Sequence, residues 1–368
     1  MSSGDYPDLF NVKKILIIKL RELGDVLLTG PVFTALQERL PEAEIDAYVY
    51  SESIPLLEGN PSVHGFIGYD RKWKKKSLIS RLFNEWQILR KIRRNRYDLV
   101  INLTEGDRGA IAAKFARAPI RVGMDPKGSG LLGKKKLYTH IVKSCPGLRH
   151  TVERNLDAIR RIGVFPSFEQ RELFLDVQSE AIRNMKAIAG SDFVLIHPAS
   201  RLKSKCWPVE KMRALATALL SEGKKLVFTS GPDAADIEMV RQIGEGLEII
   251  NLAGQISLHE LVALVSLSQV LVCVDSVPFH IASALKKPVV AIFGPSSDVT
   301  WGPWRNPNAT VVSQSFSCRP CYQNGCGGSG VSDCLVTLPV DVVLKCVLNK
   351  GNIRDGSLRQ SSYCGLRR

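Results

Sequence analysis

Short apolar runs alternate with amphipathic segments along the first half of the chain. Residues 14–19, KILIIK, are rich in β-branched side chains and show no polar alternation, which is typical of a parallel strand buried on both faces. A helix with Pro31 in its first turn is expected next. Further strands are predicted at 45–50 and 98–103, and further helices within 81–93, 109–117 and 152–163. This alternation indicates a parallel sheet covered by helices.

The same pattern starts again in the second half. Strands are predicted at 193–198, 225–230, 248–252, 270–275 and 288–294, and helices from Pro208 and within 234–244, 257–268 and 277–285. Ser257 and Glu260 have the spacing of a capping box. We therefore expect an α/β protein with two doubly wound domains, at 1–178 and 179–348, joined near 177–191. A basic tail at 349–368 is expected to be disordered.

The expected site lies in the cleft between the two domains. Ligands of doubly wound sheets bind beyond the carboxyl ends of the strands. The relevant loops are therefore those that follow Lys19, Ile196, Phe228, Val274 and Phe293.

The loops after the first strand of each half carry candidate chemistry. Asp25 places a carboxylate at a helix start, either as a base facing the cleft or as an N-cap. Ser200, Arg201 and Lys205 precede a helix N-terminus in the second half. Helix amides together with cationic side chains suit a pyrophosphate, and a solvated basic loop is the alternative.

Two later loops add further candidates. Asp233 follows a strand and either accepts ribose hydroxyls or caps the next helix. Ser276 suits a phosphate, and His280 lies one turn further on, where a hydrogen-bonded structural histidine is the alternative. Neither the loop after Lys19 nor the loop after Ile196 contains G-x-G-x-x-G, and the chain has no Walker loop, which argues against a dinucleotide-dependent enzyme.

Charge is concentrated in one part of the sequence. The 368 residues carry a net charge of +14, yet residues 71–149 alone hold 21 Lys or Arg against five Asp or Glu, a net charge of +16. We expect Lys74, Lys75, Lys76, Arg93 and Arg94 to meet an acidic acceptor or an anionic membrane surface. An apolar helix stripe in the same stretch either enters the leaflet or packs on its own domain; it consists of Leu78, Leu82, Phe83, Trp86 and Leu89. Nucleic-acid binding is the rival explanation of the charge, although no binding module is present and no specific nucleic acid is expected.

The cysteines and the chain start favour a reducing compartment. No apolar run is long enough to span a membrane, and the start MSSGDYPDLF lacks the apolar core of a secretory signal. With nine cysteines, an odd number, we expect a cytoplasmic protein. Four of them fall within 17 residues and suit either a structural zinc site or, as we favour, a reduced surface loop: Cys318, Cys321, Cys326 and Cys334.

Three sequence blocks resemble a known enzyme family. K-I-L-I-I-K-x(4)-G-D-V-L-L-T-x-P, H-P-A-S-R-x(3)-K-C-W-P and V-D-S-x(3)-H-I-A-S-A-L-x(2)-P-V-V-A-I-F-G-P-S occur in this order. They resemble the ADP-heptose:lipopolysaccharide heptosyltransferases, glycosyltransferase family 9, over residues 14–348. The run CRPCYQNGCGGSGVSDCL is most similar to the heptosyltransferase III branch, with heptosyltransferases I and II as alternatives. The resemblance implies the GT-B fold, with an acceptor-binding first domain and a donor-binding second domain.

The resemblance also implies a role for each candidate residue. Asp25 matches the general base, Ser200, Arg201 and Lys205 match the donor-diphosphate loop, Asp233 matches the ribose ligand, and Asp275, Ser276 and His280 match the motif beside the donor heptose. The sequence departs from the family at Val277 and Pro278, and Lys203 is a candidate substitute for Lys205.

The resemblance implies an inverting transfer from ADP-heptose to the lipopolysaccharide inner core, without a cofactor. We expect no obligatory metal, because Lys205, helix amides and Ser276 can stabilise the departing diphosphate. The enzyme is then expected to act peripherally at the cytoplasmic face of the inner membrane. A sugar-nucleotide epimerase is a second rival.

Overall fold

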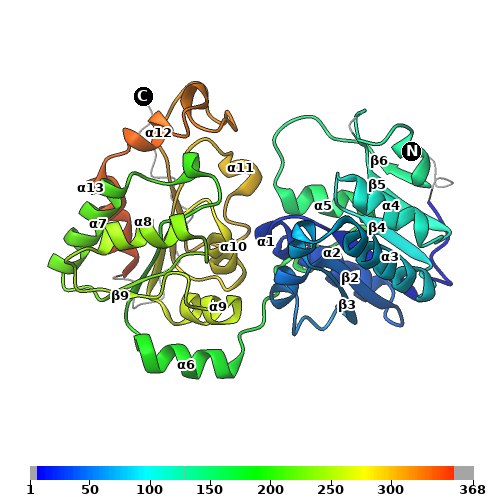
Figure 1. Cartoon of the computed structure of the whole chain (residues 1–368), viewed down its shortest axis with the longest axis horizontal. Coiled ribbons are helices and arrows are strands. Elements are labelled where there is room, and N and C mark those ends of the chain that lie inside the picture. Colours follow the sequence, from blue (N-terminus) through cyan, green and yellow to red (C-terminus); the bar gives the residue numbers. More distant parts are fainter. Residues whose placement is uncertain (1–5, 129, 352–368) are drawn as a thin grey trace. The chain divides into compact units, whose positions relative to one another are not determined.

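The computed structural model describes residues 6–128 and 130–351 and contains two sheets. The chain divides into two compact units, Met1–Asp176 and Val177–Arg368, so the division falls two residues before the expected boundary. Each unit holds one parallel sheet of six strands with helices on both of its faces (Figure 1). No helix of the described residues is long and apolar enough to cross a membrane.

In the first unit the strand order is β3-β2-β1-β4-β5-β6. The strands are β1 Lys14–Lys19, β2 Glu44–Tyr50, β3 Gly65–Tyr69, β4 Leu99–Asn102, β5 Ile120–Met124 and β6 His140–Val142. The α-helices are α1 Leu23–Leu27, α2 Gly30–Arg39, α3 Leu78–Arg94, α4 Asp107–Phe115 and α5 Thr151–Arg160. Short 3-10 helices are η1 Ser51–Leu56, η2 Arg71–Lys75, η3 Lys134–Leu137 and η4 Glu169–Arg171.

In the second unit the strand order is β12-β11-β10-β7-β8-β9. The strands are β7 Val194–His197, β8 Leu226–Phe228, β9 Ile250–Asn251, β10 Val270–Val274, β11 Val289–Ile292 and β12 Ala309–Val312. The α-helices are α6 Ser179–Ala189, α7 Val209–Ser221, α8 Ala234–Gly244, α9 Leu258–Leu267, α10 Val277–Ala284, α11 Asp298–Trp301, α12 Asp333–Val336 and α13 Val340–Gly351. The 3-10 helices are η5 Lys203–Lys205 and η6 Cys326–Gly328.

Both sheets reverse their strand order at one point. In the first unit the chain leaves β1 toward β2 on one side and reaches β4 on the other, and β7 lies in the same way between β8 and β10. Crossovers that diverge in this way leave a crevice at the carboxyl edge of the sheet, which is where ligands of such folds bind. The residues that follow β1, β4, β7 and β10 are therefore the ones the fold positions for function.

The apolar runs fold as the pattern predicts because both sheet faces are covered. Leu16 and Ile18 are fully buried on one face of β1, and Ile15 and Ile17 are as deeply buried on the other. Ser257 accepts a hydrogen bond from the backbone N–H of Glu260, and the Glu260 carboxylate accepts one from that of Ser257, so the predicted capping box is present.

The structure also corrects some expectations. The segment expected to join the domains contains α6, which packs on α9 within the second unit. The last helix, α13, continues to Gly351, so residues 349–351 are helical and do not belong to a disordered tail. The remainder of the expected tail, 352–368, lies outside the described residues. Strands β3, β5, β6 and β12 were not predicted, because they are short or carry polar residues such as Arg121 and His140.

Candidate active site

Asp25 lies at the carboxyl edge of the first sheet. It is the third residue of α1, whose N-cap is Glu22, so Asp25 does not occupy the N-cap position that was its alternative role. Its side chain is only 13% exposed, and its Oδ1 lies 3.8 Å from Nζ of Lys19, the last residue of β1. The carboxylate thus stands over the switch point between β1 and β4 with a buried ammonium group beside it.

Lys19 connects the end of β1 to the residue after β4 and to α5 through hydrogen bonds. Its ammonium donates hydrogen bonds of 3.2 Å to the carbonyl oxygen of Leu103, just beyond β4, and to Oδ1 of Asn155 in α5. Burial lowers the pKa of Lys19 to about 8, although the nearby Asp25 carboxylate acts in the opposite direction. At neutral pH Lys19 is therefore mostly charged, and it holds Asp25 in place as a fixed cationic neighbour.

The loops that follow β7, β10 and β11 meet around Asp275 in the second unit. The Lys205 ammonium donates a 2.7 Å hydrogen bond to Oδ2 of Asp275, and the Ser296 hydroxyl donates to the same oxygen. Ser200 donates to the backbone carbonyl oxygen of Asp275 at 3.2 Å. Asp275 is 6% exposed and Lys205 is 25% exposed. Asp275 therefore holds the loop in place, and the Lys205 ammonium group lies partly exposed at the carboxyl edge of the sheet.

Lys205 keeps donor capacity for a ligand. An ammonium group has three N–H donors, and among the described residues Asp275 is the only hydrogen-bond acceptor of Lys205. The remaining two donors, at the switch point between β7 and β10, are suited to the oxygens of a diphosphate.

The other predicted donor residues surround this cluster or lie on the next loop. Ser276 is the N-cap residue of α10, but its hydroxyl turns back to donate to the carbonyl oxygen of Val274. His280 is buried in α10 with its ring beside those of Phe279 and Trp301. Arg201 is exposed on the loop that holds Ser200. Asp233 is the N-cap residue of α8 and is exposed, and its carboxylate accepts no capping hydrogen bond from the described part of that helix.

Three residues of these networks were missed in the sequence. Lys19 carries a recognisable signal, because a lysine that ends an otherwise apolar strand must find buried partners. Ser296 stands at the end of the third motif, after β11. Asn155 carries no local signal, because it is one polar residue of an amphipathic helix, 136 positions away from its partner Lys19.

Four of the five cations of the predicted basic surface are exposed on α3 or just before it. Lys75, Lys76, Arg93 and Arg94 are exposed, whereas the side chain of Lys74 lies outside the described part of the chain. Of the predicted apolar stripe, Leu78, Leu82, Phe83 and Trp86 are exposed and Leu89 packs against the core. The stripe as a whole therefore does not pack on its own domain; the buried face of α3 carries Ile88 and Ile92 instead.

The four clustered cysteines do not form a metal site in the described residues. Cys318 and Cys326 are exposed, Cys321 is half-buried and Cys334 is buried. Burial raises the pKa of the Cys334 thiol, and Cys326 Sγ accepts a hydrogen bond from the backbone N–H of Asp333 at 3.4 Å. No group of three or more His, Cys, Asp or Glu side chains is arranged to hold a metal ion within the part of the chain that is described.

The sequence matches the model of glycosyltransferase family 9 (heptosyltransferase) over residues 85–331. It is 33% identical to lipopolysaccharide heptosyltransferase 3 of Escherichia coli over 293 residues, which are 78% of this chain and 85% of the relative. A protein of the same description from E. coli strain K12 is 34% identical over 297 residues, 77% of this chain and 83% of the relative. Lipopolysaccharide heptosyltransferase 2 of Salmonella typhimurium is 28% identical over 299 residues, 77% and 83% of the two chains.

Solved structures share the fold over nearly the whole chain. The glycosyltransferase family 9 protein of Veillonella parvula has a TM-score of 0.79 at 23% identity, covering 95% of this chain and 99% of its own. ADP-heptose lps heptosyltransferase II of E. coli has a TM-score of 0.75 at 23% identity, covering 92% and 98%. E. coli heptosyltransferase WaaC with ADP has a TM-score of 0.73 at 20% identity, covering 92% and 99%. These likenesses confirm the predicted GT-B fold.

Proposed function

Because the chain belongs to glycosyltransferase family 9, the heptosyltransferase family, we propose that it transfers a heptose from ADP-heptose to the core of lipopolysaccharide. The fold and the family make it a glycosyltransferase. The donor and the acceptor are proposed from relatives whose descriptions name ADP, ADP-heptose or lipopolysaccharide.

The second unit is proposed to bind the donor, and the observation that carries this assignment is the placement of Lys205. Its ammonium is held by Asp275 at the switch point of the second sheet and retains two donors. The diphosphate of an ADP-sugar supplies the acceptors that these donors need. Ser200 and Ser276 on the neighbouring loops contribute hydroxyl groups, Arg201 a guanidinium, His280 the wall near the sugar, and Asp233 an exposed carboxylate for the ribose. Asp275 itself is a positioning residue, because its carboxylate is already occupied.

The first unit is proposed to bind the acceptor and supply the base. The Asp25 carboxylate removes the proton of the acceptor hydroxyl, whose oxygen attacks the anomeric carbon on the face opposite the diphosphate. The new glycosidic C–O bond forms as the bond from the anomeric carbon to the phosphate oxygen breaks, which inverts the configuration. ADP leaves with both electrons of that bond, and the fixed charge of Lys205 stabilises it. No metal ion is needed in this scheme.

The transfer step proposed is the third heptose, a branch added to the second. The two relatives described as lipopolysaccharide heptosyltransferase 3 are 33% and 34% identical to this chain. Relatives described as heptosyltransferase 1 or 2 are 24–28% identical. Lipopolysaccharide core heptosyltransferase OpsX of Haemophilus influenzae is 23% identical. The lipopolysaccharide acceptor places the enzyme at the cytoplasmic face of the inner membrane, where the exposed cations Lys75, Lys76, Arg93 and Arg94 face an acidic surface.

The decisive experiment measures which acceptor gains mass. The purified chain is incubated with ADP-heptose and lipopolysaccharide from strains whose cores end after zero, one, two or three heptoses, and each product is analysed by mass spectrometry. We expect one additional heptose on the core that ends after two heptoses and none on the other three cores. Addition to a core with no heptose or with one would assign the chain to the first or second step instead. No addition to any core, with intact ADP binding, would refute the lipopolysaccharide acceptor.

The matched control for this assay is Asp25→Asn. It keeps the size of the side chain and removes the base, so it should bind ADP as the wild type does and give no product.

A further inference from the structure

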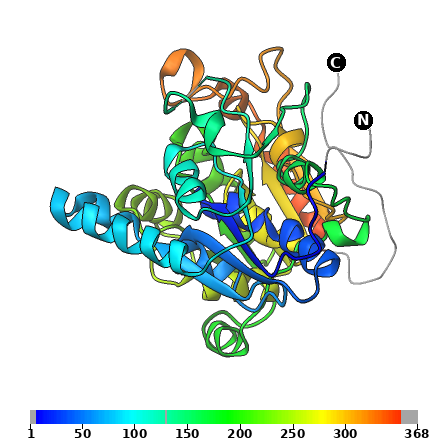
Figure 2. The ribbon, with the colours of Figure 1, turned by 90° about the vertical axis from the view of Figure 1, so that its right-hand side faces the viewer.

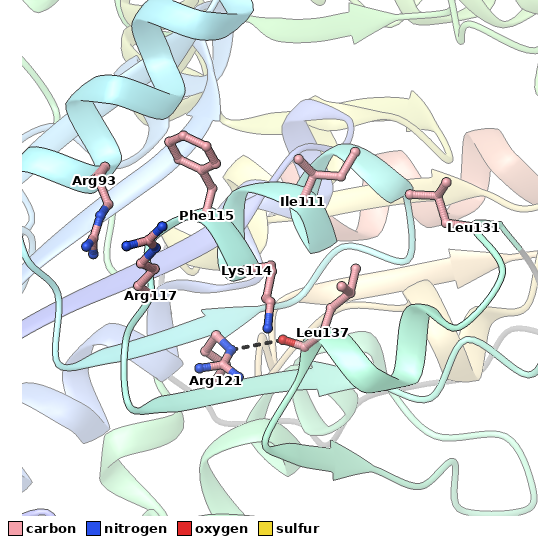
Figure 3. A pocket seen from close by; sticks show the side chains of 8 residues that line it. All are labelled: Arg93, Ile111, Lys114, Phe115, Arg117, Arg121, Leu131 and Leu137. Atoms are coloured by element: carbon pink, nitrogen blue, oxygen red, sulfur yellow. Dashed lines mark hydrogen bonds between the residues drawn. The ribbon is translucent and has the colours of Figure 1, made fainter.

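A pocket of about 680 Å³ opens on the first unit at the amino-terminal edge of its sheet. Its basic lining consists of Arg93 at the end of α3, Lys114 in α4, Arg117 between α4 and β5, and Arg121 near the start of β5 (Figure 3). Asp25 lies at the carboxyl edge of the same sheet. The pocket therefore lies at the end of the unit away from the proposed base, and no step of the proposed transfer uses it.

The charge of this pocket is not neutralised locally. Arg93 donates a hydrogen bond to the backbone carbonyl oxygen of Ala116, and Arg121 donates to that of Leu137. No carboxylate lines the pocket, and none among the described residues forms an ion pair with any of the four cations.

Other cations of the sequence stretch 71–149 form ion pairs with carboxylates. Arg71 pairs with Glu22 and Glu52, and Arg108 pairs with Glu85. Four unpaired cations around one hollow attract an anion.

Arg117 occupies a backbone position that favours glycine. It follows Ala116, the C-cap of α4, and has φ +56°, in the left-handed region. A side chain other than glycine costs about 1–2 kcal/mol there.

Two exposed apolar side chains, Leu82 and Trp86, lie on the same face of α3 as Arg93, which lines the pocket. Leu82, Trp86, Leu89 and Arg93 follow one another at spacings of four, three and four along α3, so they share one face of the helix. Leu82 and Trp86 are 60% and 49% exposed, and Arg93 ends this stripe at the pocket wall. In Figure 2, α3 is the light blue helix that extends outward beyond the sheet it covers.

The other walls of the pocket are apolar as well. They are formed by Ile111, Phe115, Leu131 and Leu137, of which the first three are exposed. Apolar walls beside a group of cations suit an amphipathic ligand with an anionic headgroup and an apolar chain.

We propose that this pocket binds the phosphate of an anionic phospholipid headgroup and that the stripe of Leu82 and Trp86 enters the interface of the same leaflet. The four cations match a phosphate, and the exposed stripe matches the acyl boundary next to it. The site goes beyond the proposed function, because it binds a lipid whether or not the chain transfers a sugar.

The test compares two arginine variants, only one of which removes a cation that lines the pocket. Arg117→Gly removes a pocket cation, and Arg96→Gly removes an exposed cation that follows the C-cap of α3 with φ +53° and does not line the pocket. Both lose the same charge and relieve the same kind of backbone strain, so both should melt at or above the wild-type temperature. The measurement is sedimentation with vesicles of phosphatidylcholine alone or mixed with phosphatidylglycerol, over a series of salt concentrations.

We expect the partition coefficient into anionic vesicles to be about tenfold lower for Arg117→Gly than for Arg96→Gly. Arg117→Gly loses a charge-assisted hydrogen bond to the phosphate as well as the long-range electrostatic attraction that both variants lose. Equal losses in the two variants would overturn the proposal. Loss of binding to random-sequence RNA in Arg117→Gly alone, with equal vesicle binding, would assign the pocket to nucleic acid and also overturn it.

A second pair of variants separates a lipid from a free anion. Trp86→Ser should weaken vesicle binding and remove a blue shift of tryptophan emission, whereas Phe10→Ser, at an 88% exposed aromatic outside the stripe, should change neither. If inorganic phosphate binds the pocket as tightly as vesicles do and Trp86→Ser partitions like the wild type, the ligand is a soluble anion and the lipid assignment fails.

Discussion

Replacing Lys205 tests the proposed donor site most directly. Lys205→Ala removes the ammonium that lies 2.7 Å from Asp275 and leaves the rest of the loop unchanged. If this group stabilises the departing diphosphate, its loss should lower kcat about 10²- to 10³-fold, or about 3–4 kcal/mol of transition-state stabilisation. ADP binding should weaken as well, because the same donors contact the diphosphate of the ground state.

The same substitution has a cost in stability that must be separated from catalysis. Asp275 is 6% exposed, and without Lys205 its carboxylate keeps only the Ser296 hydroxyl as a side-chain donor among the described residues. Breaking a fully buried pair costs roughly 3–5 kcal/mol, and we expect about 2 kcal/mol here because Lys205 is one quarter exposed. The double variant Lys205→Ala, Asp275→Asn removes the uncompensated charge, so it should regain stability without regaining activity.

Lys203→Ala is the matched control. Lys203 is exposed in the same 3-10 helix and loses the same charge, so its effect on kcat should stay below about threefold. The assay is the initial rate of sugar transfer at varied ADP-heptose, with the melting temperature of each variant measured alongside. A larger loss in Lys203→Ala than in Lys205→Ala, or recovery of activity in the double variant, would refute the assignment of Lys205.

Three further predictions concern other parts of the chain. Asp25→Asn should abolish transfer with an unchanged dissociation constant for ADP, and residual transfer near the wild-type rate would show that another group is the base. Lys19 has a folded-state pKa of about 8 against an ordinary value of 10.5, so between these pH values the unfolded chain binds the extra proton and stability should rise with pH. Urea unfolding of the wild type and Lys19→Met should show the wild type gaining up to about 3 kcal/mol on the variant across that window, whereas a constant difference would contradict the lowered pKa. Ser257→Ala should destabilise the second unit by about 1 kcal/mol through loss of the N-cap of α9, which urea unfolding detects; an unchanged midpoint would mean that the cap contributes nothing.

The family and both sheets follow from local sequence. Runs such as 14–19 and 270–275 have no polar alternation because helices cover both faces of each sheet, so the pattern alone identifies parallel strands. The positions of Asp25 and of the 197–208 loop follow next, since the ends of such strands meet at one edge. Short strands such as β5 and β6 escaped this reasoning, because their pairing depends on neighbours rather than on their own composition.

The partners within the site were decided by tertiary structure. Lys205 and Asp275 are 70 positions apart, and Lys19 and Asn155 are 136 positions apart, so no local pattern specifies their contacts. The sequence also placed Trp86 in a stripe without deciding whether the stripe was covered, because an amphipathic helix buries whichever face its neighbours reach. Helix α3 is held to the sheet by Ile88 and Ile92, which leaves Trp86 exposed. Composition thus determined that this unit is strongly basic, whereas only folding determined which of its cations gather without a carboxylate beside them.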